Sequence, residues 1–294
     1  MKKNIGNIFA LGAYISWAVF PIYWKMLGGI DPLQLSSHRI IWSFLLLVLF
    51  LFVTKQSKDF LSQAWNFETI KIYSLAGVLL ATNWSIYVYA VTSGHIVETS
   101  LGYFINPLVS VLLGVVFLHE KMRPFQWLAA LFAAIGVIYL TLTVGTIPYI
   151  ALGLALSFGM YGFLKKRSKL NSTFGLTLET GVLFIPALFY VLYSETTGNP
   201  SFGTSSINFR LLLIGGGLVT TIPLIMFAQA AKLIPLSHLG FFQYVTPTVT
   251  FLLGVYLYGE PFDHTHLIGF GLVWFGLLIF IVESVTVLLQ KKES

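Results

Sequence analysis

Long apolar runs follow one another along almost the whole of this 294-residue chain, and they constrain its fold more than any other feature. A bilayer core of about 30 Å needs about 20 apolar residues per helix. Segments that reach or approach that length are 5–27, 33–54, 70–92, 97–118, 124–143, 147–164, 173–193, 210–231, 236–258 and 265–288. A membrane-spanning barrel would show short alternating strands instead. The pattern therefore predicts an all-α integral membrane protein with ten transmembrane helices.

Charged residues are too few to cover a soluble domain. They make up 10% of the chain, whereas soluble domains carry about 25%. The net charge of +6 comes from basic residues in short segments between the apolar runs. That placement is typical of membrane orientation and not of a nucleic-acid-binding face. We therefore expect the lipid bilayer as the surroundings of this chain and no nucleic-acid partner.

The distribution of lysine and arginine predicts the orientation. If the N-terminus is cytoplasmic, 14 of the 17 basic residues fall in cytoplasmic segments, and only Lys25, Arg39 and Arg210 fall elsewhere. The positive-inside rule then predicts a multi-pass protein of the plasma (cytoplasmic) membrane with both termini in the cytoplasm. The first apolar run has no small-residue cleavage site, so we expect a retained span and not a signal peptide.

The chain contains an internal repeat. Residues 10–25, "ALGAYISWAVFPIYWK", align with residues 151–166, "ALGLALSFGMYGFLKK", at an offset of 141. Residues 100–114, "SLGYFINPLVSVLLG", align with residues 238–254, "HLGFFQYVTPTVTFLLG". In the second pair a two-residue indel separates the Leu-Gly dipeptide from the proline, after which the offset is 140. The chain is therefore predicted to consist of two homologous halves.

Each half holds five predicted helices, and an odd number places the second half upside down relative to the first. The predicted domains are one repeat over residues 5–143 and an inverted repeat over residues 147–288. Inverted repeats are typical of secondary transporters, whose substrate site lies near the bilayer midplane between the repeats. Pro107 and Pro247, at matching places in the two halves, predict symmetric helix kinks that could act as pivots.

Motifs of soluble enzymes are absent from the sequence. There is no P-loop, dinucleotide fingerprint, zinc-protease helix or nucleophile elbow. The absence of cysteine excludes disulfides, thiolate metal sites and cysteine nucleophiles. His38 has no second histidine or acidic pair at ligand spacing. We therefore predict no catalytic residues, no cofactor and no metal.

Arg39 and Glu179 are the most informative charges. Arg39 lies about 9 Å along the second predicted helix, and intramembrane charges almost always face a cavity or a partner. Glu179 aligns with Arg39 at the offset of 140, at the same depth from the opposite face. We expect each to guard one end of a shared cavity, Glu179 together with Lys165 or Lys166. Lys25 is either part of this path or a lysine that snorkels to the interface.

Glu98 begins the fourth predicted helix and has two interpretations. It could cap the helix, where an acidic residue favours the dipole. It could also be a gate carboxylate that pairs with Arg39 or Lys25. Glu98 and Glu179 are accordingly the candidates for proton coupling or gating.

Further polar and aromatic residues are predicted to lie between the membrane depths of Arg39 and Glu179. A ligand cavity requires apolar walls with a few fixed polar groups. The alternative for any single aromatic residue is a place in the interfacial belt. The candidate translocation path comprises Trp17, Lys25, His38, Arg39, Trp42, Asn83, Tyr87, Tyr103, Asn106, Glu179, Gln243 and Tyr244.

Several stretches resemble a known family over nearly the whole chain. They are "FPIYWK", "HRIIWS", "NWSIYVYAV", "ETSLGYFINPLVSVLLG" and "LGFFQYVTPT". They are similar to the RarD-type members of the drug/metabolite transporter superfamily, which carry two EamA repeats. The resemblance implies ten transmembrane helices, an inner-membrane location and secondary transport by alternating access. The family is linked by name to chloramphenicol sensitivity, and related exporters handle amino acids and other metabolites.

The sequence thus predicts a secondary transporter that exports small metabolites or drug-like molecules. The basic residues of the path suit a carboxylate or phosphate, as in an amino acid or organic anion. One alternative is a proton-independent facilitator or channel-like protein, from which saturable flux would distinguish a transporter. The second alternative is an intramembrane enzyme. The oligomeric state, the coupling ion and the identity of the small-molecule substrate are not predicted.

Overall fold

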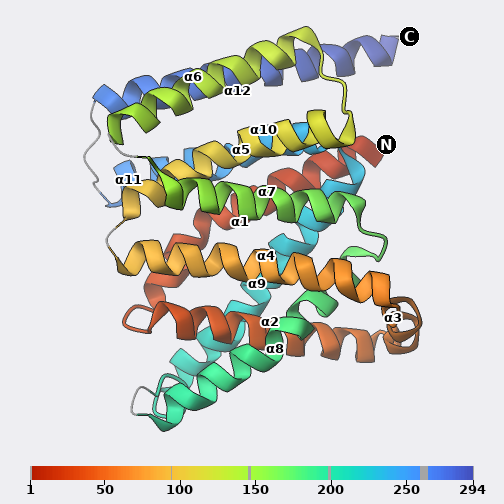
Figure 1. The fold of residues 1–294 in the computed structure, drawn as a ribbon, viewed down its shortest axis with the longest axis vertical. Coiled ribbons are helices and arrows are strands. Elements are labelled where there is room, and N and C mark those ends of the chain that lie inside the picture. The colour runs from red at the N-terminus through yellow and green to blue at the C-terminus, as the bar shows by residue number, and fades with distance from the viewer. Residues whose placement is uncertain (1, 94, 145–146, 198–199, 259–263, 294) are drawn as a thin grey trace. The chain divides into compact units, whose positions relative to one another are not determined.

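The computed structural model describes residues 2–93, 95–144, 147–197, 200–258 and 264–293 (Figure 1). The described residues form helices joined by turns and short loops, and no strand occurs among them. The helices are α1 (Lys2–Met26), α2 (Pro32–Val53), α3 (Ser57–Ala64), α4 (Phe67–Thr92), α5 (Ile96–Leu118), α6 (Pro124–Val144), α7 (Tyr149–Arg167), α8 (Ser172–Thr196), α9 (Ile207–Leu233), α10 (Leu236–Gln243), α11 (Val245–Tyr258) and α12 (His264–Glu293).

Helix covers every predicted apolar segment, with two departures from the prediction. The short helix α3 lies between the second and third segments, and the ninth segment is divided into α10 and α11. By length and hydropathy, the described residues contain seven helices that can cross a membrane, namely α1, α2, α5, α6, α8, α9 and α12. The chain is therefore an all-helical multi-pass membrane protein. The count of ten crossings stays a prediction.

The division of the ninth segment follows from its sequence. Pro247 has no N–H group, so the Gln243 carbonyl lacks the donor that an unbroken helix supplies four residues later. The two-residue indel lies just before this point, and two extra residues would turn the side chains of an α-helix by about 200°. A break at Tyr244 accommodates both features, whereas Pro107 lies inside the continuous helix α5.

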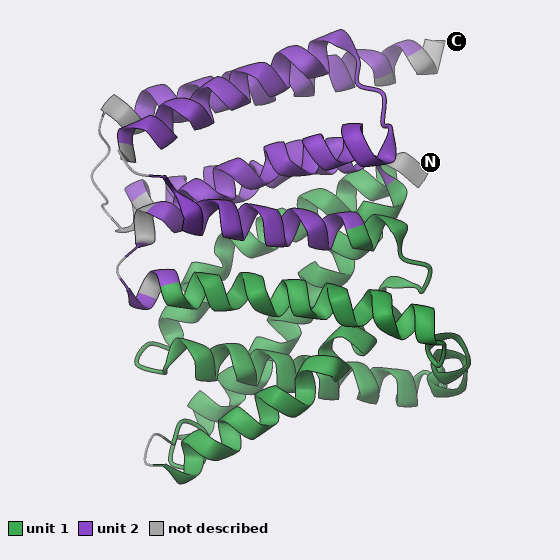
Figure 2. Ribbon diagram, in the orientation of Figure 1, with its two compact units in different colours: residues 1–89, 164–233 green, residues 90–163, 234–294 purple. Residues whose placement is uncertain are grey.

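The helices form two compact units, and Figure 2 colours each one separately. Unit 1 comprises residues 1–89 and 164–233, and unit 2 comprises residues 90–163 and 234–294. Unit 1 holds α1, α2, α3, most of α4, α8 and α9, whereas unit 2 holds α5, α6, most of α7, α10, α11 and α12. Each unit therefore takes helices from both halves of the sequence, and neither unit corresponds to one predicted repeat.

In unit 1, α2 packs against α8, and the two helices occupy equivalent positions in the repeat. Asp31 caps α2 by accepting from the Leu33 and Gln34 N–H groups at 3.0 and 2.9 Å. Asn171, its counterpart at the offset of 140, caps α8 by accepting from the Phe174 N–H at 2.7 Å. Such side-chain caps satisfy the free N–H groups of a first turn. The repeat is thus visible in local structure as well as in sequence.

Contacts in both units pair equivalent parts of the two halves. The rings of Phe44 and Phe184 lie 4.9 Å apart in unit 1. The rings of Phe104 and Tyr244 lie 6.4 Å apart in unit 2. Phe44 and Phe184 are equivalent at the offset of 140, and Phe104 and Tyr244 lie in the equivalent stretches that contain the two-residue indel. Contacts between equivalent parts of two homologous halves are expected beside a two-fold axis that relates them.

The helices α6 and α12, which lie side by side in Figure 1, make the most symmetric contact. A Cβ added at Gly136 would lie 2.8 Å from the Gly269 carbonyl oxygen, and one at Gly276 would lie 2.6 Å from the Ala129 carbonyl oxygen. Gly276 is the equivalent of Gly136, and Gly269 is the equivalent of Ala129, at the same offset. Small residues permit this close backbone approach.

Gly136→Ala and Gly276→Ala are each expected to lower the melting temperature of the detergent-purified protein. The added methyl would overlap a backbone carbonyl, and overpacking costs about 1–3 kcal/mol. Gly271→Ala is the control in α12, because no described heavy atom lies within 4 Å of its Cβ. Equal melting temperatures for the three variants would contradict this account of the α6–α12 contact.

Candidate functional site

Arg39 occupies a box of aromatic side chains in unit 1. Its guanidinium carbon lies 4.8 Å from the centroid of Trp24 and 4.5 Å from that of Trp84, and its Nε donates to Thr220 Oγ1 at 2.9 Å. Thus α1, α2, α4 and α9 each contribute one residue to this cluster, which we call the Arg39 box. Aromatic faces attract a cation through their quadrupole. The box therefore reduces the cost of a cation seven residues inside an apolar helix.

Close packing around the box depends on glycine in α9. A Cβ added at Gly217 would lie 2.5 Å from Trp42 Cβ, and one at Gly216 would lie 3.8 Å from Arg39 Cγ. Ser43 Oγ donates to the Gly217 carbonyl at 3.0 Å across the same contact. Tyr87, half exposed, is close enough to Arg39 for electrostatic interaction. Asn83 lies beside Trp84 in the sequence and is half-buried.

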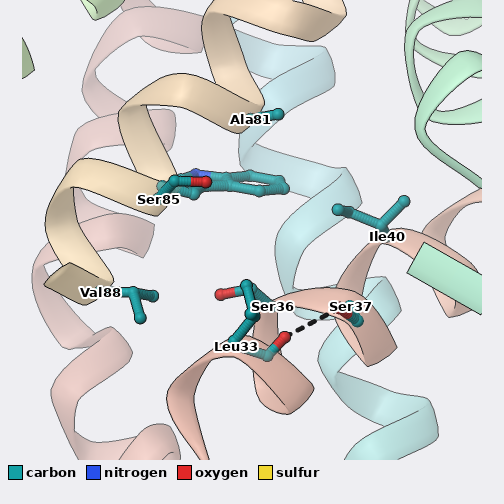
Figure 3. A pocket seen from close by; sticks show the side chains of 8 residues that line it. Leu33, Ser36, Ser37, Ile40, Ala81, Ser85 and Val88 are labelled. Carbon is teal, nitrogen blue, oxygen red and sulfur yellow. Dashed lines mark hydrogen bonds between the residues drawn. The ribbon is translucent and has the colours of Figure 1, made fainter. Parts of the chain in front are cut away.

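A small cavity adjoins the box (Figure 3). Its volume is about 50 Å³, and it is lined by Leu33, Ser36, Ser37, Ile40, Ala81, Trp84, Ser85 and Val88. Trp84 thus borders both the cavity and Arg39. The Ser36 and Ser37 hydroxyls donate to carbonyls of their own helix at 2.9 and 2.8 Å. Ligand pockets usually hold about 300–1,000 Å³, so this cavity is too small for a metabolite.

A loop between α8 and α9 covers His38 and Trp42. Glu195 accepts from the N–H groups of Ser201, Phe202 and Gly203 at 2.7–2.9 Å. The Phe202 ring stacks on His38 at 5.6 Å and lies 5.7 Å from Trp42. His38 Nε2 also forms a 3.2 Å hydrogen bond with Ser201 Oγ. The carboxylate therefore fixes the loop so that an aromatic ring seals this face of α2.

Glu179 forms a fully buried ion pair with Lys165 in unit 1. Lys165 Nζ lies 2.6 Å from Glu179 Oε1, and the side chains are 1% and 0% exposed. The ammonium also lies 5.4 Å from the centre of the Tyr73 ring. The Leu170 N–H donates to Tyr73 Oη at 2.9 Å, and Lys232 Nζ donates to the Leu170 carbonyl. The expected pairing of Glu179 with Lys165 is therefore present.

The Arg39 box and the Lys165–Glu179 pair occupy equivalent places in the repeat. Glu179 corresponds to Arg39 at the offset of 140, and Lys165 corresponds to Trp24 at the offset of 141. Arg39 and Glu179 each lie seven residues after the first residue of their helix. Each half thus places a first-helix side chain against a second-helix charge. One site holds a cation by aromatic faces, whereas the other holds an anion by a lysine.

Unit 2 contains five of the predicted residues. Glu98, buried in the first turn of α5, accepts from the Ile150 N–H at the start of α7 at 3.3 Å. It therefore caps a neighbouring helix as well as lying at the start of its own. Tyr103 is 44% exposed, whereas Asn106, Gln243 and Tyr244 are buried. Gln243 Nε2 donates to Ser110 Oγ at 2.9 Å.

The structure thus gathers some predicted residues and leaves others apart. Arg39 is the centre of the box, Tyr87 lies near it, and His38 and Trp42 flank it on α2 beside the Phe202 ring. Trp17 packs instead against Tyr14 and Phe227, at ring distances of 5.4 and 5.7 Å. Lys25 is exposed in the last turn of α1, where a cation favours the helix dipole.

Several residues of these sites were not predicted from the sequence. They are Trp24, Tyr73, Trp84, Glu195, Phe202, Thr220 and Lys232. Trp24 and Trp84 occur within the quoted "FPIYWK" and "NWSIYVYAV" motifs and could have been found there. Glu195, an acidic residue at the end of an apolar run, was a weaker signal.

Comparisons with known proteins agree with this architecture. A model of the EamA-like transporter family matches residues 4–142 and 146–282. The chain is 43% identical over 287 residues to the uncharacterized transporter YojE of Bacillus subtilis, covering 95% of this chain and 94% of that protein. It is 38% identical over 280 residues to protein RarD of Escherichia coli, covering 95% of each. The chain belongs to the EamA-like transporter family and is a RarD-type member of it.

Two more distant matches extend the comparison. The chloramphenicol-sensitive protein RarD of Pseudomonas aeruginosa is 27% identical over 279 residues, covering 93% of this chain and 92% of that protein. A solved crystal structure matches with a TM-score of 0.70 at 17% identity, covering 93% of this chain and 96% of that chain. At that identity the match shows a shared fold and nothing about substrate.

Arg39 and Trp84 are expected to be energetically coupled. In a double-mutant cycle with Arg39→Met and Trp84→Leu, the coupling free energy should be about 1–2 kcal/mol, because a desolvated cation–π contact is worth that much. Thermal or denaturant unfolding of the purified protein measures it. Trp127, exposed in α6 of unit 2, supplies the control partner as Trp127→Leu. Coupling no larger than that of the control would contradict the box.

Breaking the Lys165–Glu179 pair on one side should destabilise the protein more than removing both partners. Lys165→Met or Glu179→Leu leaves a buried, uncompensated charge, which costs about 3–5 kcal/mol, whereas the double variant avoids that penalty. Melting temperatures of the three variants test this order. Arg123→Gln, which breaks the more exposed ion pair with Glu283, should have a smaller effect. A double variant less stable than both single variants would contradict the interpretation.

Proposed function

We propose that this protein is a secondary transporter that exports small metabolites or drug-like molecules by alternating access, and that its substrates carry a carboxylate or a similar anionic group. The observation that carries the proposal is the Arg39 box. A planar cation is held between two indoles and a hydroxyl inside an apolar helix. Arginine presents its donors in a fork that matches a carboxylate.

The position equivalent to Arg39 in the other half, Glu179, is the basis for the second part of the proposal, a gate at the cytoplasmic end. Glu179, at the matching depth, is neutralised by Lys165 and shielded from water. We assign this pair to a gate at the cytoplasmic end, because four more basic residues, Lys166, Arg167, Lys169 and Lys232, lie close to it in the sequence or structure. Opening would hydrate both charges and release Lys165. Protonation of Glu179 would favour that opened state, which makes Glu179 the preferred site of proton coupling over Glu98.

At the opposite end, the loop that carries Phe202 is assigned to the outer gate. Its ring covers His38 and Trp42 beside Arg39, and the Glu195 carboxylate holds the loop in place. Displacement of the ring would expose the α2 face to water. The cavity of about 50 Å³ next to Trp84 would then enlarge toward Arg39. The Arg39 box beside this loop is the repeat equivalent of the Lys165–Glu179 pair, and alternating access through an inverted repeat requires that such equivalent sites open in turn.

The remaining parts of the proposal concern topology. Ten crossings, arranged as two inverted five-helix repeats, accommodate α4, α7 and the α10–α11 pair as additional spans. The excess of basic residues in alternate connecting segments supports cytoplasmic termini and a cytoplasmic-membrane location. Export rather than import is carried over from the resemblance to exporters of the drug/metabolite transporter superfamily.

The substrate class can be tested by ligand-induced stabilisation. A ligand that binds only the native state raises its apparent stability in proportion to the logarithm of ligand concentration over the dissociation constant. We expect some amino or organic acids to raise the melting temperature of the detergent-purified protein, and the corresponding amides to have little effect. Arg39→Lys keeps the charge but loses the planar fork, so it should abolish most of the response.

Equal responses in the wild type and Arg39→Lys would contradict the role of Arg39. A response to neutral aromatic compounds alone, unchanged in Arg39→Lys, would show that the substrate is not anionic. Lys25→Arg serves as the control, because Lys25 is exposed at the end of α1.

A further inference from the structure

The buried interface between α5 and α10 in unit 2 contains hydrogen-bond acceptors that have no donor. Asn106 is 8% exposed and Gln243 is 5% exposed. Among the described residues, none donates a hydrogen bond to Asn106 Oδ1 or Gln243 Oε1. A buried polar atom without a partner normally incurs a desolvation penalty, so such atoms are uncommon unless something else satisfies them.

Asn106 and Gln243 lie in the same part of this interface, because α10 runs antiparallel to α5. At the beginning of α10, the Leu236 and Ser237 N–H groups donate to Glu120 just beyond the C-terminus of α5, at 2.7 and 2.8 Å. Six residues later, Gln243 reaches Ser110. One residue further on, Tyr244 contacts Phe104. Asn106 lies between these two α5 positions and one turn before Ser110, on the same face of the helix.

Local geometry explains why Gln243 and the end of α10 present acceptors without donors. Gln243 uses its amide nitrogen on Ser110, so its oxygen is the free end. The Gln243 backbone carbonyl lacks an α-helical donor because Pro247 occupies the required position. The C-terminal end of α10 points its carbonyls to the same break, where the helix dipole is negative. Interrupted membrane helices coordinate cations in this way.

Three features of this location suit a transported or coupling ligand. Asn106 is near the middle of α5, about 15 Å from either end of the helix at 1.5 Å per residue. Phe104, two residues before Asn106, packs against Tyr244 in the equivalent stretch of the other half. The Tyr244 hydroxyl, 1% exposed, is another polar group for which the described residues provide no partner.

We propose that Asn106 Oδ1, Gln243 Oε1 and the carbonyl end of α10 form a binding site for a compact monocation. The occupant is either the ammonium group of a transported substrate or a sodium ion, both of which require oxygen acceptors. If the occupant is a substrate ammonium group, the inference rests on the proposed function, because the substrate is then an amino acid and not only a carboxylate. The sodium source does not depend on the identity of the substrate.

The test compares melting temperatures of the detergent-purified full chain under two titrations. The first uses pairs of compounds that share a carboxylate and differ by one amino group, such as a 2-amino acid and the matching 2-hydroxy acid. The second uses sodium chloride against choline chloride at equal concentration. Each titration is made with the wild type, Gln243→Leu, Gln243→Glu and Ser110→Ala.

An ammonium site predicts half-maximal stabilisation at a concentration about tenfold lower for the amino compound than for its hydroxy analogue, since a hydrogen bond to a charged group has that order of effect on affinity. A sodium site predicts stabilisation by sodium and not by choline. In either case the difference in stabilisation, between amino and hydroxy compounds or between sodium and choline, should disappear in Gln243→Leu. The same difference should increase in Gln243→Glu, because that variant adds a negative charge. Ser110→Ala should retain this difference in stabilisation, because the Gln243 side-chain oxygen is still present in that variant.

The proposal is overturned if neither titration shows a difference in the wild type, or if the difference persists in Gln243→Leu. A wild type that responds equally to amino and hydroxy compounds and ignores sodium would leave the proposed anionic substrate intact and eliminate this site. If no carboxylate stabilises the protein but sodium does so through Gln243, the site stands and the proposed substrate class fails.

Discussion

Contacts between three pairs of equivalent helices from the two halves are the interactions on which the rest of the structure depends. α2 meets α8 at Phe44 and Phe184, α5 meets the α10–α11 break at Phe104 and Tyr244, and α6 meets α12 at reciprocal glycines. Lipid tails are as apolar as leucine, so the hydrophobic effect contributes little to such contacts and close backbone packing must supply them. The contacts draw each compact unit from both halves of the chain and set the positions of its charges.

The roles proposed for the charged residues follow from that arrangement. Equivalent places in the repeat hold an arginine between two indoles and a glutamate paired with a lysine. The aromatic box and the ion pair both compensate a buried charge for its lost hydration, but the entry of water affects the two interactions differently. An ion pair loses most of its attraction once solvent enters, because the dielectric constant rises, whereas the indole faces hold Arg39 through quadrupole attraction and apolar contact. Equivalent backbone positions in the two halves can therefore hold charged sites with different properties.

Much of this architecture could be predicted from the sequence. Apolar length located the long helices to within a few residues, and the repeat offset placed Glu179 at the position equivalent to Arg39, with Lys165 nearby. The sequence did not reveal that α3 exists, that Pro247 ends α10, or that the compact units combine both halves. Helix length and hydropathy describe one helix at a time, whereas the Arg39 box depends on side chains from four helices. Trp24 and Trp84 stood out only as parts of the quoted motifs, because nothing in their local sequence specifies a shared partner.

Counterflow in proteoliposomes tests the central claim of alternating access through the Arg39 site most directly. Vesicles are preloaded with an unlabelled carboxylate that stabilises the purified protein, and the uptake of the same labelled compound is followed over time. The account predicts transient accumulation of label above equilibrium with the wild type and its loss with Arg39→Gln reconstituted at equal density. Uptake that never exceeds equilibrium would indicate a channel-like pathway, and unchanged counterflow in Arg39→Gln would contradict the role assigned to the box.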